Sequence, residues 1–177
     1  MNRFKLRCVI LWLRLIRKLR PTKELMAFRK NGSGIKTALI IFPEGQENSR
    51  IARYFLKSVY ANKEMDLHFL MDIHLYHSFM GTLPTSVHIY TDEDISWFGL
   101  PQPEFVRRVC SRKYHAVVDM HPSFNLATAY LTYLSKAPIR VGFSGEFSPH
   151  FFNVEIDKKG SQFIEKSYLS IQKLLNL

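Results

Sequence analysis

A block of thirty residues, 114–143, constrains the fold of this chain more than any other part of the sequence. It opens with the apolar run Ala116–Val118, passes through a polar turn at His121–Asn125, and then spaces its apolar residues as a helix does. A second run suited to a strand, Ile139–Phe143, closes the block. Strand, loop, helix and strand within about thirty residues make one βαβ unit, which joins two parallel strands. Because open α/β sheets hold their ligands beyond the carboxyl ends of the strands, the polar turn marks a candidate binding site.

The rest of the chain after residue 36 alternates between strand and helix patterns. We expect further strands at Thr37–Phe42, Leu67–Met71, Ser86–Tyr90 and Phe152–Ile156, and helices at Asn48–Tyr60, Glu104–Arg112 and Ser161–Leu175. The runs 37–42 and 114–120 are apolar without alternation, as in strands covered on both faces, so they should lie near the middle of the sheet. The sequence therefore predicts an α/β fold. It is a single Rossmann-like domain over residues 36–177, with a mostly parallel sheet of about five or six strands and helices on both faces.

Charge is concentrated at the N-terminus. The net charge is +10, but residues 1–36 hold eleven Lys and Arg against the single acid Glu24, while the rest of the chain carries fourteen residues of each sign. A nucleic-acid reader usually has its basic patch on the folded body, so this distribution argues against nucleic acid as a partner. The two cysteines, Cys8 and Cys110, form no CxxC motif and no disulfide framework, which fits a reducing cytoplasm.

Residues 1–20 predict a basic amphipathic helix, and residues 21–35 a linker. At about 100° per residue, the basic residues of one face are Arg3, Arg7, Arg14, Arg17 and Lys18. The apolar residues of the other face are Phe4, Cys8, Leu11, Trp12, Leu15, Ile16 and Leu19. The longest apolar run, Cys8–Leu13, is far shorter than the ~20 residues that cross a bilayer.

Two interpretations of this helix stay open, besides a third in which it binds a partner. In the first, Trp12 and the five basic residues contact anionic lipid, which places the protein peripherally at the inner, cytoplasmic face of the membrane. In the second, the helix packs on the surface of its own domain with its arginines in solvent.

The block 114–143 also resembles a known family, the family 9 glycosyltransferases, whose heptosyltransferases build lipopolysaccharide cores. There, a YDLVIDLQ-like strand leads into a helix rich in small residues, and a GAPIRIGF-like strand follows. Here residues 114–121 read YHAVVDMH and residues 136–143 read KAPIRVGF. The resemblance extends loosely back to residue 35. A complete enzyme of that family has two Rossmann-like domains in the GT-B arrangement, and only the N-terminal, acceptor-side domain is resembled here. The resemblance therefore implies a separate donor-binding domain.

The resemblance also suggests which residues to consider for catalysis. Family members place a Gly–Asp pair at the opening of the helix after the first strand, and that Asp is the expected general base for the acceptor hydroxyl. The matching position here is Asn48, preceded by Glu47. A carboxamide has no useful basicity, so Glu47 or Glu44 replaces the base only where the loop brings it within hydrogen-bond range of the proton. The alternative is that Asn48 is a helix N-cap without chemistry. We expect the isolated chain to be inactive.

Candidate contacts for an acceptor follow the strand ends: Gly45, Asp119, His121, Ser123 and Asn125. Gly45 permits close approach of a ligand to the backbone, whereas Asp119 and His121 serve equally well as a structural cap. One glycine in the loop 43–50 is no phosphate-binding fingerprint, so no cofactor is implied.

We expect no metal site. His115 and His121 lie about 20 Å apart on an extended strand, too far for one ion. His74 and His77 have no evident third ligand.

Three hypotheses remain open. The first is a glycosyltransferase-like domain of lipopolysaccharide or envelope polysaccharide synthesis, with an envelope glycolipid as acceptor. The second is a non-catalytic, membrane-associated binding or scaffolding module of the same fold. The third is an unrelated small α/β protein, which a strand order foreign to the family would favour.

Overall fold

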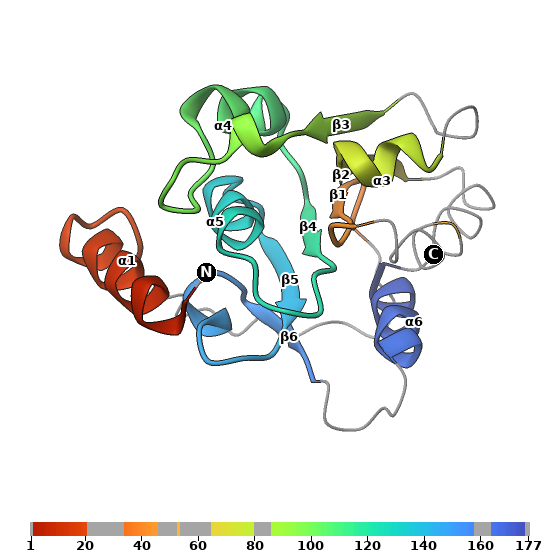
Figure 1. The fold of residues 1–177 in the computed structure, drawn as a ribbon. Coiled ribbons are helices and arrows are strands. Elements are labelled where there is room, and N and C mark those ends of the chain that lie inside the picture. The colour runs from red at the N-terminus through yellow and green to blue at the C-terminus, as the bar shows by residue number, and fades with distance from the viewer. Residues whose placement is uncertain are drawn as a thin grey trace.

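The computed structural model describes residues 2–20, 34–45, 53, 65–79, 86–157 and 164–175. Six parallel strands form one sheet in the order β3-β2-β1-β4-β5-β6 (Figure 1). The strands are β1 (Thr37–Ile41), β2 (Asp66–Asp72), β3 (Val87–Tyr90), β4 (Ala116–Asp119), β5 (Ile139–Phe143) and β6 (Val154–Ile156). The expected α/β class and parallel sheet are confirmed.

The two strands expected near the middle of the sheet are there. β1 pairs with β2 on one side and with β4 on the other. Alternate residues of β1 enter different cores: Ala38 and Ile40 face one side of the sheet, and Leu39 and Ile41 the other, all with no exposed surface. This burial on two faces explains why the run is apolar without alternation.

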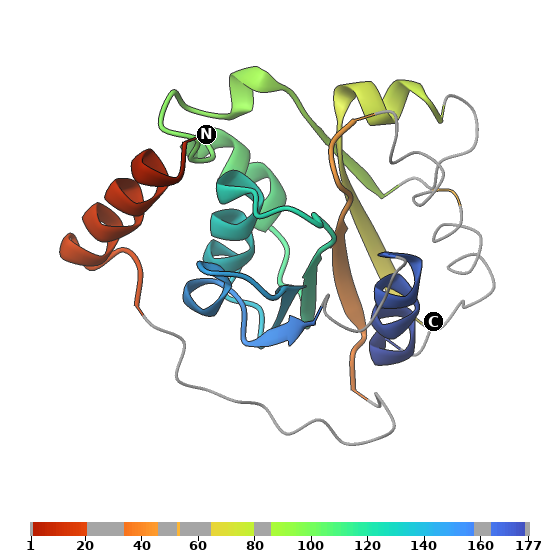
Figure 2. The same ribbon diagram turned by 60° about the horizontal axis from the view of Figure 1, so that its bottom comes forward.

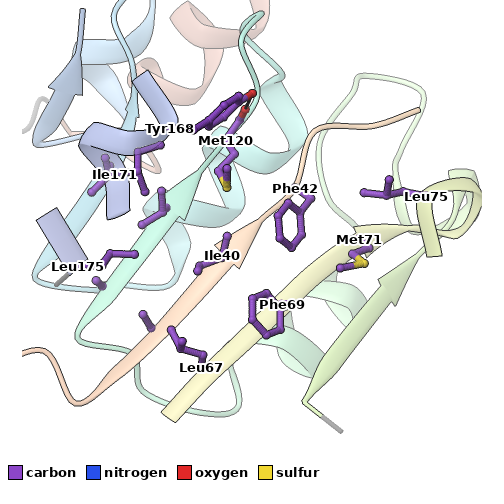
Figure 3. Close-up of a cluster of buried hydrophobic side chains, with 14 of the residues drawn as sticks. Ile40, Phe42, Leu67, Phe69, Met71, Leu75, Met120, Tyr168, Ile171 and Leu175 are labelled. Atoms are coloured by element: carbon purple, nitrogen blue, oxygen red, sulfur yellow. Dashed lines mark hydrogen bonds between the residues drawn. The ribbon is translucent and has the colours of Figure 1, made fainter. Parts of the chain in front are cut away.

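Helices cover both faces of this sheet (Figure 2). α4 (Pro103–Cys110) and α5 (Leu126–Leu134) pack on the face of Leu39 and Ile41. α3 (Ile73–His77) and α6 (Ile164–Leu175) contribute to the core on the opposite face, which Figure 3 shows. There the rings of Phe42 and Phe69 stack with centroids 5.8 Å apart, and the Tyr168 hydroxyl of α6 donates to the Met120 carbonyl at 3.1 Å.

The N-terminal helix α1 (Arg3–Leu15) forms a further layer outside α5. Its buried side chains are Leu6, Val9, Ile10 and Leu13, and they pack against α5 and the Phe151–Phe152 segment beyond the short helix η3 (Ser148–His150). The helix is shorter than the expected 1–20. The chain reverses at Arg17, whose φ is 58°, and the Leu19 amide donates to the Leu13 carbonyl.

Element boundaries elsewhere differ from the predicted ones by a few residues at most. The exceptions are α3 and the two 3₁₀ turns η2 (Asp92–Asp94) and η3, which the sequence did not predict. α3 begins because the Asp72 carboxylate accepts from the amides of His74 and Leu75 and so caps the helix. Several predictions lie outside the described residues: the predicted helix Asn48–Tyr60 apart from residue 53, the candidates Glu47 and Asn48, and most of the predicted linker.

Candidate functional site

Polar side chains gather where β1 and β4 end. The chain leaves β1 for β2 on one side, while β4 lies on the other, so the strand order reverses direction between these two neighbours. Such a switch point is where open α/β sheets form a crevice for ligands. The segment 43–45 follows β1 and the segment 121–125 follows β4, and the two meet here.

Glu44 is the centre of the first hydrogen-bond network. Its Oε1 accepts from the Tyr90 hydroxyl at 3.0 Å and from Nδ2 of Asn125 at 2.9 Å. Asn125 is also the N-cap of α5, and its Oδ1 accepts from the Ala127 amide. Burial and then the negative charge of Glu44 raise the pKa of Tyr90 well above its ordinary value, so the phenol stays protonated and donates. The exposed Glu44 carboxylate is therefore held in a fixed direction by residues of two other elements.

Gly45 holds the same loop against β2. Its amide donates to Oδ1 of Asp72 at 3.3 Å, and its φ is 93°. Side chains rarely adopt that conformation, so the position favours glycine for a backbone reason.

Asp119 and His121 form a buried pair below this loop. Oδ1 of Asp119 lies 2.7 Å from Nδ1 of His121, and Oδ2 accepts from the Thr128 hydroxyl at 2.8 Å. The Glu44 amide donates to Nε2 of His121 at 3.3 Å, so this imidazole links the ends of β4 and β1. Burial lowers the pKa of His121, but the nearby carboxylates, Asp119 first, outweigh burial and the net direction is upward.

A cavity of about 680 Å³ opens over these residues. Its wall includes Glu44, Gly45, His121, Ser123 and Asn125, and also Leu6 of α1. A second hollow of about 750 Å³ shares Glu44, Gly45 and Asp92 with it and extends along Asp72 and Tyr90. The wall thus offers carboxylate acceptors together with amide and hydroxyl groups, which can bind a ligand rich in hydroxyl groups.

Four of the five residues expected to contact an acceptor line this one cavity. The fifth, Asp119, is 2% exposed and reaches the cavity only through His121. Two participants were not predicted: Tyr90 and Thr128. Tyr90 ends β3, so its place at the carboxyl edge was readable from the sequence, whereas nothing in the sequence indicates that Thr128 holds Asp119. No group of three His, Cys, Asp or Glu side chains in the described part of the chain is arranged to hold a metal ion.

The fold and this site define a Rossmann-like α/β domain with a polar cavity at its switch point. Among solved structures, a family 9 glycosyltransferase from Veillonella parvula is similar with a TM-score of 0.58 and 17% identity. The match covers 79% of this chain and 41% of that one. The heptosyltransferase WaaC of E. coli, solved with ADP, is similar with a TM-score of 0.53 and 13% identity, over 78% of this chain and 46% of that one. These similarities show a shared fold, and this chain spans less than half of either protein.

Residues 14–171 match the family of unknown function DUF6913, and the chain belongs to that family. No curated protein matches it.

Proposed function

We propose that this chain is the acceptor-side half of a glycosyltransferase-like system in lipopolysaccharide or envelope polysaccharide synthesis. In this proposal the cavity over Glu44 and His121 binds sugar hydroxyl groups of an envelope glycolipid. One observation supports it most: Tyr90 and Asn125 fix the Glu44 carboxylate at the switch point of a sheet that family 9 glycosyltransferases share. A fixed carboxylate beside amide and imidazole groups suits hydroxyls, which both donate and accept.

The proposal includes inactivity of the isolated chain. A nucleotide-sugar requires a donor-binding domain, which we propose is supplied separately. Loss of acid–base assistance costs about 10²–10⁴-fold in rate, and loss of donor positioning removes a larger factor. We further propose that the protein works at the cytoplasmic face of the membrane, with α1 as its contact.

A second candidate is a non-catalytic module that binds the acceptor and presents it to another enzyme. The observation that favours it is that the Glu44 carboxylate is already held by two protein donors. The hypothesis of an unrelated α/β protein gains no support from the fold, because the chain is similar in structure to a family 9 glycosyltransferase over 79% of its length.

Sugar binding is the first test. Core oligosaccharides and heptose are titrated against the labelled chain, and amide shifts are followed by NMR. We expect shifts at Gly45 and at residues 121–125, weakened at least about tenfold by Glu44→Gln because a charge-assisted hydrogen bond is lost. Glu104→Gln is the matched control, since Glu104 is exposed on α4 and paired with Arg107 at 2.7 Å. Unchanged spectra at all ligand concentrations would refute the proposed site.

Turnover separates the two candidates. The chain is incubated with nucleotide-sugars and glycolipid acceptors, alone and with a donor-binding domain. Turnover only in the mixture supports the half-enzyme, and binding without turnover in either case supports the scaffold. Turnover by the isolated chain that disappears in Glu44→Gln or Glu47→Gln would contradict inactivity and identify the base.

A further inference from the structure

α1 has two apolar faces on opposite sides of the helix. Leu6, Val9, Ile10 and Leu13 face the domain and are buried. The face assigned from the sequence is a different one and remains exposed. Its exposed fractions are 74% for Phe4, 62% for Leu11, 52% for Trp12 and 83% for Leu15. The helix is therefore fixed to the domain and still presents a row of large apolar side chains outward.

A tight turn beside α1 presents two more aromatic side chains. Ser96 accepts from the Gly99 amide at 2.8 Å, and the Gly99 φ of 76° closes the turn. At its tip, Trp97 is 83% exposed and Phe98 is 58% exposed. Because the turn is closed by backbone hydrogen bonds, these rings are held outward before any partner arrives.

The turn and the helix form one surface. Nζ of Lys5 donates to the Trp97 carbonyl at 3.2 Å and lies 4.8 Å from the centroid of its ring. An apolar groove of about 430 Å³ runs between the two elements, lined by Lys5, Cys8, Val9, Trp12, Phe98 and Leu100. Of the eight large hydrophobic side chains that are exposed in the described residues, seven belong to α1, its C-cap or this turn. We name these seven the apolar platform: Phe4, Leu11, Trp12, Leu15, Ile16, Trp97 and Phe98.

Positive charge borders the apolar platform. Residues 2–20 contain seven Lys and Arg and no acid, and Arg3, Arg14 and Lys18 are exposed. Asp94, the acid nearest in sequence to the turn, is paired with Arg108 at 2.9 Å, and the next two, Asp92 and Glu93, line the hollow beside Tyr90. On α1 itself, Arg7 is paired with Glu146. Aromatic rings beside the exposed basic side chains of Arg3, Arg14 and Lys18 match the interface of a bilayer that contains anionic lipid.

We propose that the apolar platform is a two-element docking surface for an anionic lipid bilayer, in which the Trp97–Phe98 turn inserts beside α1. This gives the membrane location proposed above its second point of contact. Two points of insertion fix the orientation of the domain, whereas a helix alone fixes only attachment. None of the helices in the part of the chain that the structure describes is long and apolar enough to span a bilayer.

The cavity over Glu44 shares Leu6 and Gly99 with the two elements that carry the platform. Leu6 lies on the buried face of α1, whereas Gly99 directly follows Phe98 of the platform, so the cavity reaches the base of the turn. This position suits a glycolipid acceptor if the cavity binds sugar as proposed. The lipid contact itself does not depend on sugar binding.

The two tryptophans of the chain, Trp12 and Trp97, both lie in the platform and serve as reporters. The full chain and its single-tryptophan variants Trp12→Phe and Trp97→Phe are titrated with two vesicle types. One is phosphatidylglycerol mixed with phosphatidylcholine, and the other is phosphatidylcholine alone. We expect a blue shift of both reporters and quenching by brominated lipid with the anionic vesicles. An unshifted Trp97 in Trp12→Phe would overturn the two-element proposal.

Partition measurements test the turn directly. The double variant Trp97→Ser/Phe98→Ser should bind vesicles more weakly by about tenfold or more, because it lacks the two rings that are proposed to insert into the bilayer. Leu169→Ser is the control, since Leu169 is the one exposed large hydrophobic of the described residues outside the platform, and its affinity should be unchanged. Arg3→Gln/Arg14→Gln should weaken binding to the anionic vesicles by about fivefold per charge.

Equal affinity of the Trp97→Ser/Phe98→Ser and Leu169→Ser variants would refute the proposal. A second result would also refute it: light scattering shows a dimer that the turn substitutions dissociate, and no form of the chain binds vesicles. The sugar titration of Glu44→Gln reports on the cavity alone. If the chain binds vesicles but not sugar, the proposed function is refuted and the proposal of a lipid-binding surface still stands.

Discussion

Gly142 in β5 should not tolerate even one additional methyl group. A Cβ at this position would overlap the ring of Phe152, with Cδ2 and Cζ at 2.5 Å and Cε2 closer still. Phe152 is 5% exposed and packs in the core between α1 and α5, so its ring has little room to move. Overpacking of this kind costs about 1–3 kcal/mol. The lower chain entropy of alanine in the unfolded state returns about 0.4–1 kcal/mol.

The expected result for Gly142→Ala is a net loss of roughly 1–2 kcal/mol in the free energy of unfolding. For a chain of this size, that corresponds to a Tm lower by about 2–8 °C. Chemical denaturation followed by circular dichroism measures the loss. Gly145→Ala is the control, because a Cβ there meets no heavy atom within 4 Å.

A double-mutant cycle isolates the clash. Phe152→Leu removes the ring atoms that Cβ would meet, so Gly142→Ala should cost at least about 1 kcal/mol less in that background. Equal denaturation midpoints for Gly142→Ala, Gly145→Ala and the unmodified chain would show that the ring shifts freely and that the packing argument is wrong.

Three other substitutions test the site and α1. Thr128→Val removes the donor to buried Asp119 and should cost about 1–3 kcal/mol in denaturation. Thr132→Val, which loses only a hydroxyl bond to the Thr128 carbonyl at 2.9 Å, should cost less. Because the folded pKa of His121 is raised, its protonated form adds stability below about pH 6.5 that is lost as pH rises through the folded pKa. His121→Asn should therefore cost most in acid, and a cost independent of pH would contradict this. Leu13→Ala, at 1% exposure, should lose about 2–5 kcal/mol. The matched Leu15→Ala should stay within about 0.5 kcal/mol, and equal losses would mean that α1 packs differently.

The sheet was predictable because burial on two faces leaves a direct trace in the sequence. The runs Ala38–Ile41 of β1 and Ala116–Val118 of β4 are apolar at every position, and a strand covered on one face would not be. Glu44, Gly45, His121 and Asn125 could be predicted as site residues because they follow these two strands, and parallel strands bring their carboxyl ends to one edge of the sheet.

The contacts that fix these residues were not predictable. The hydrogen bond from Tyr90 to Glu44 depends on β3 lying beyond β2 at the edge of the sheet. The residues of one strand do not indicate its place in the strand order, so this contact could not be predicted. α1 shows a different limit. A helical wheel identifies apolar faces but not which of two faces packs, so the buried row that includes Leu13 was overlooked. Leu19, expected beside Trp12, is 2% exposed because the reversal at Arg17 turns it inward.

The strand order also has a consequence for the order of folding. β4 pairs with β5 through Ala116 and Ile139, which are 23 residues apart, but with β1 through Ala116 and Ala38, which are 78 apart. The longer closure costs about 1 kcal/mol more in chain entropy. The β4–α5–β5 unit should therefore form first and serve as the template on which β1 docks, so that the crevice between β1 and β4 is completed late. In pulse-labelled hydrogen exchange, the Ile139 amide, which donates to the His115 carbonyl, should gain protection before the Met120 amide, which donates to the Ile41 carbonyl of β1. Simultaneous protection of the two amides would contradict this sequence of events.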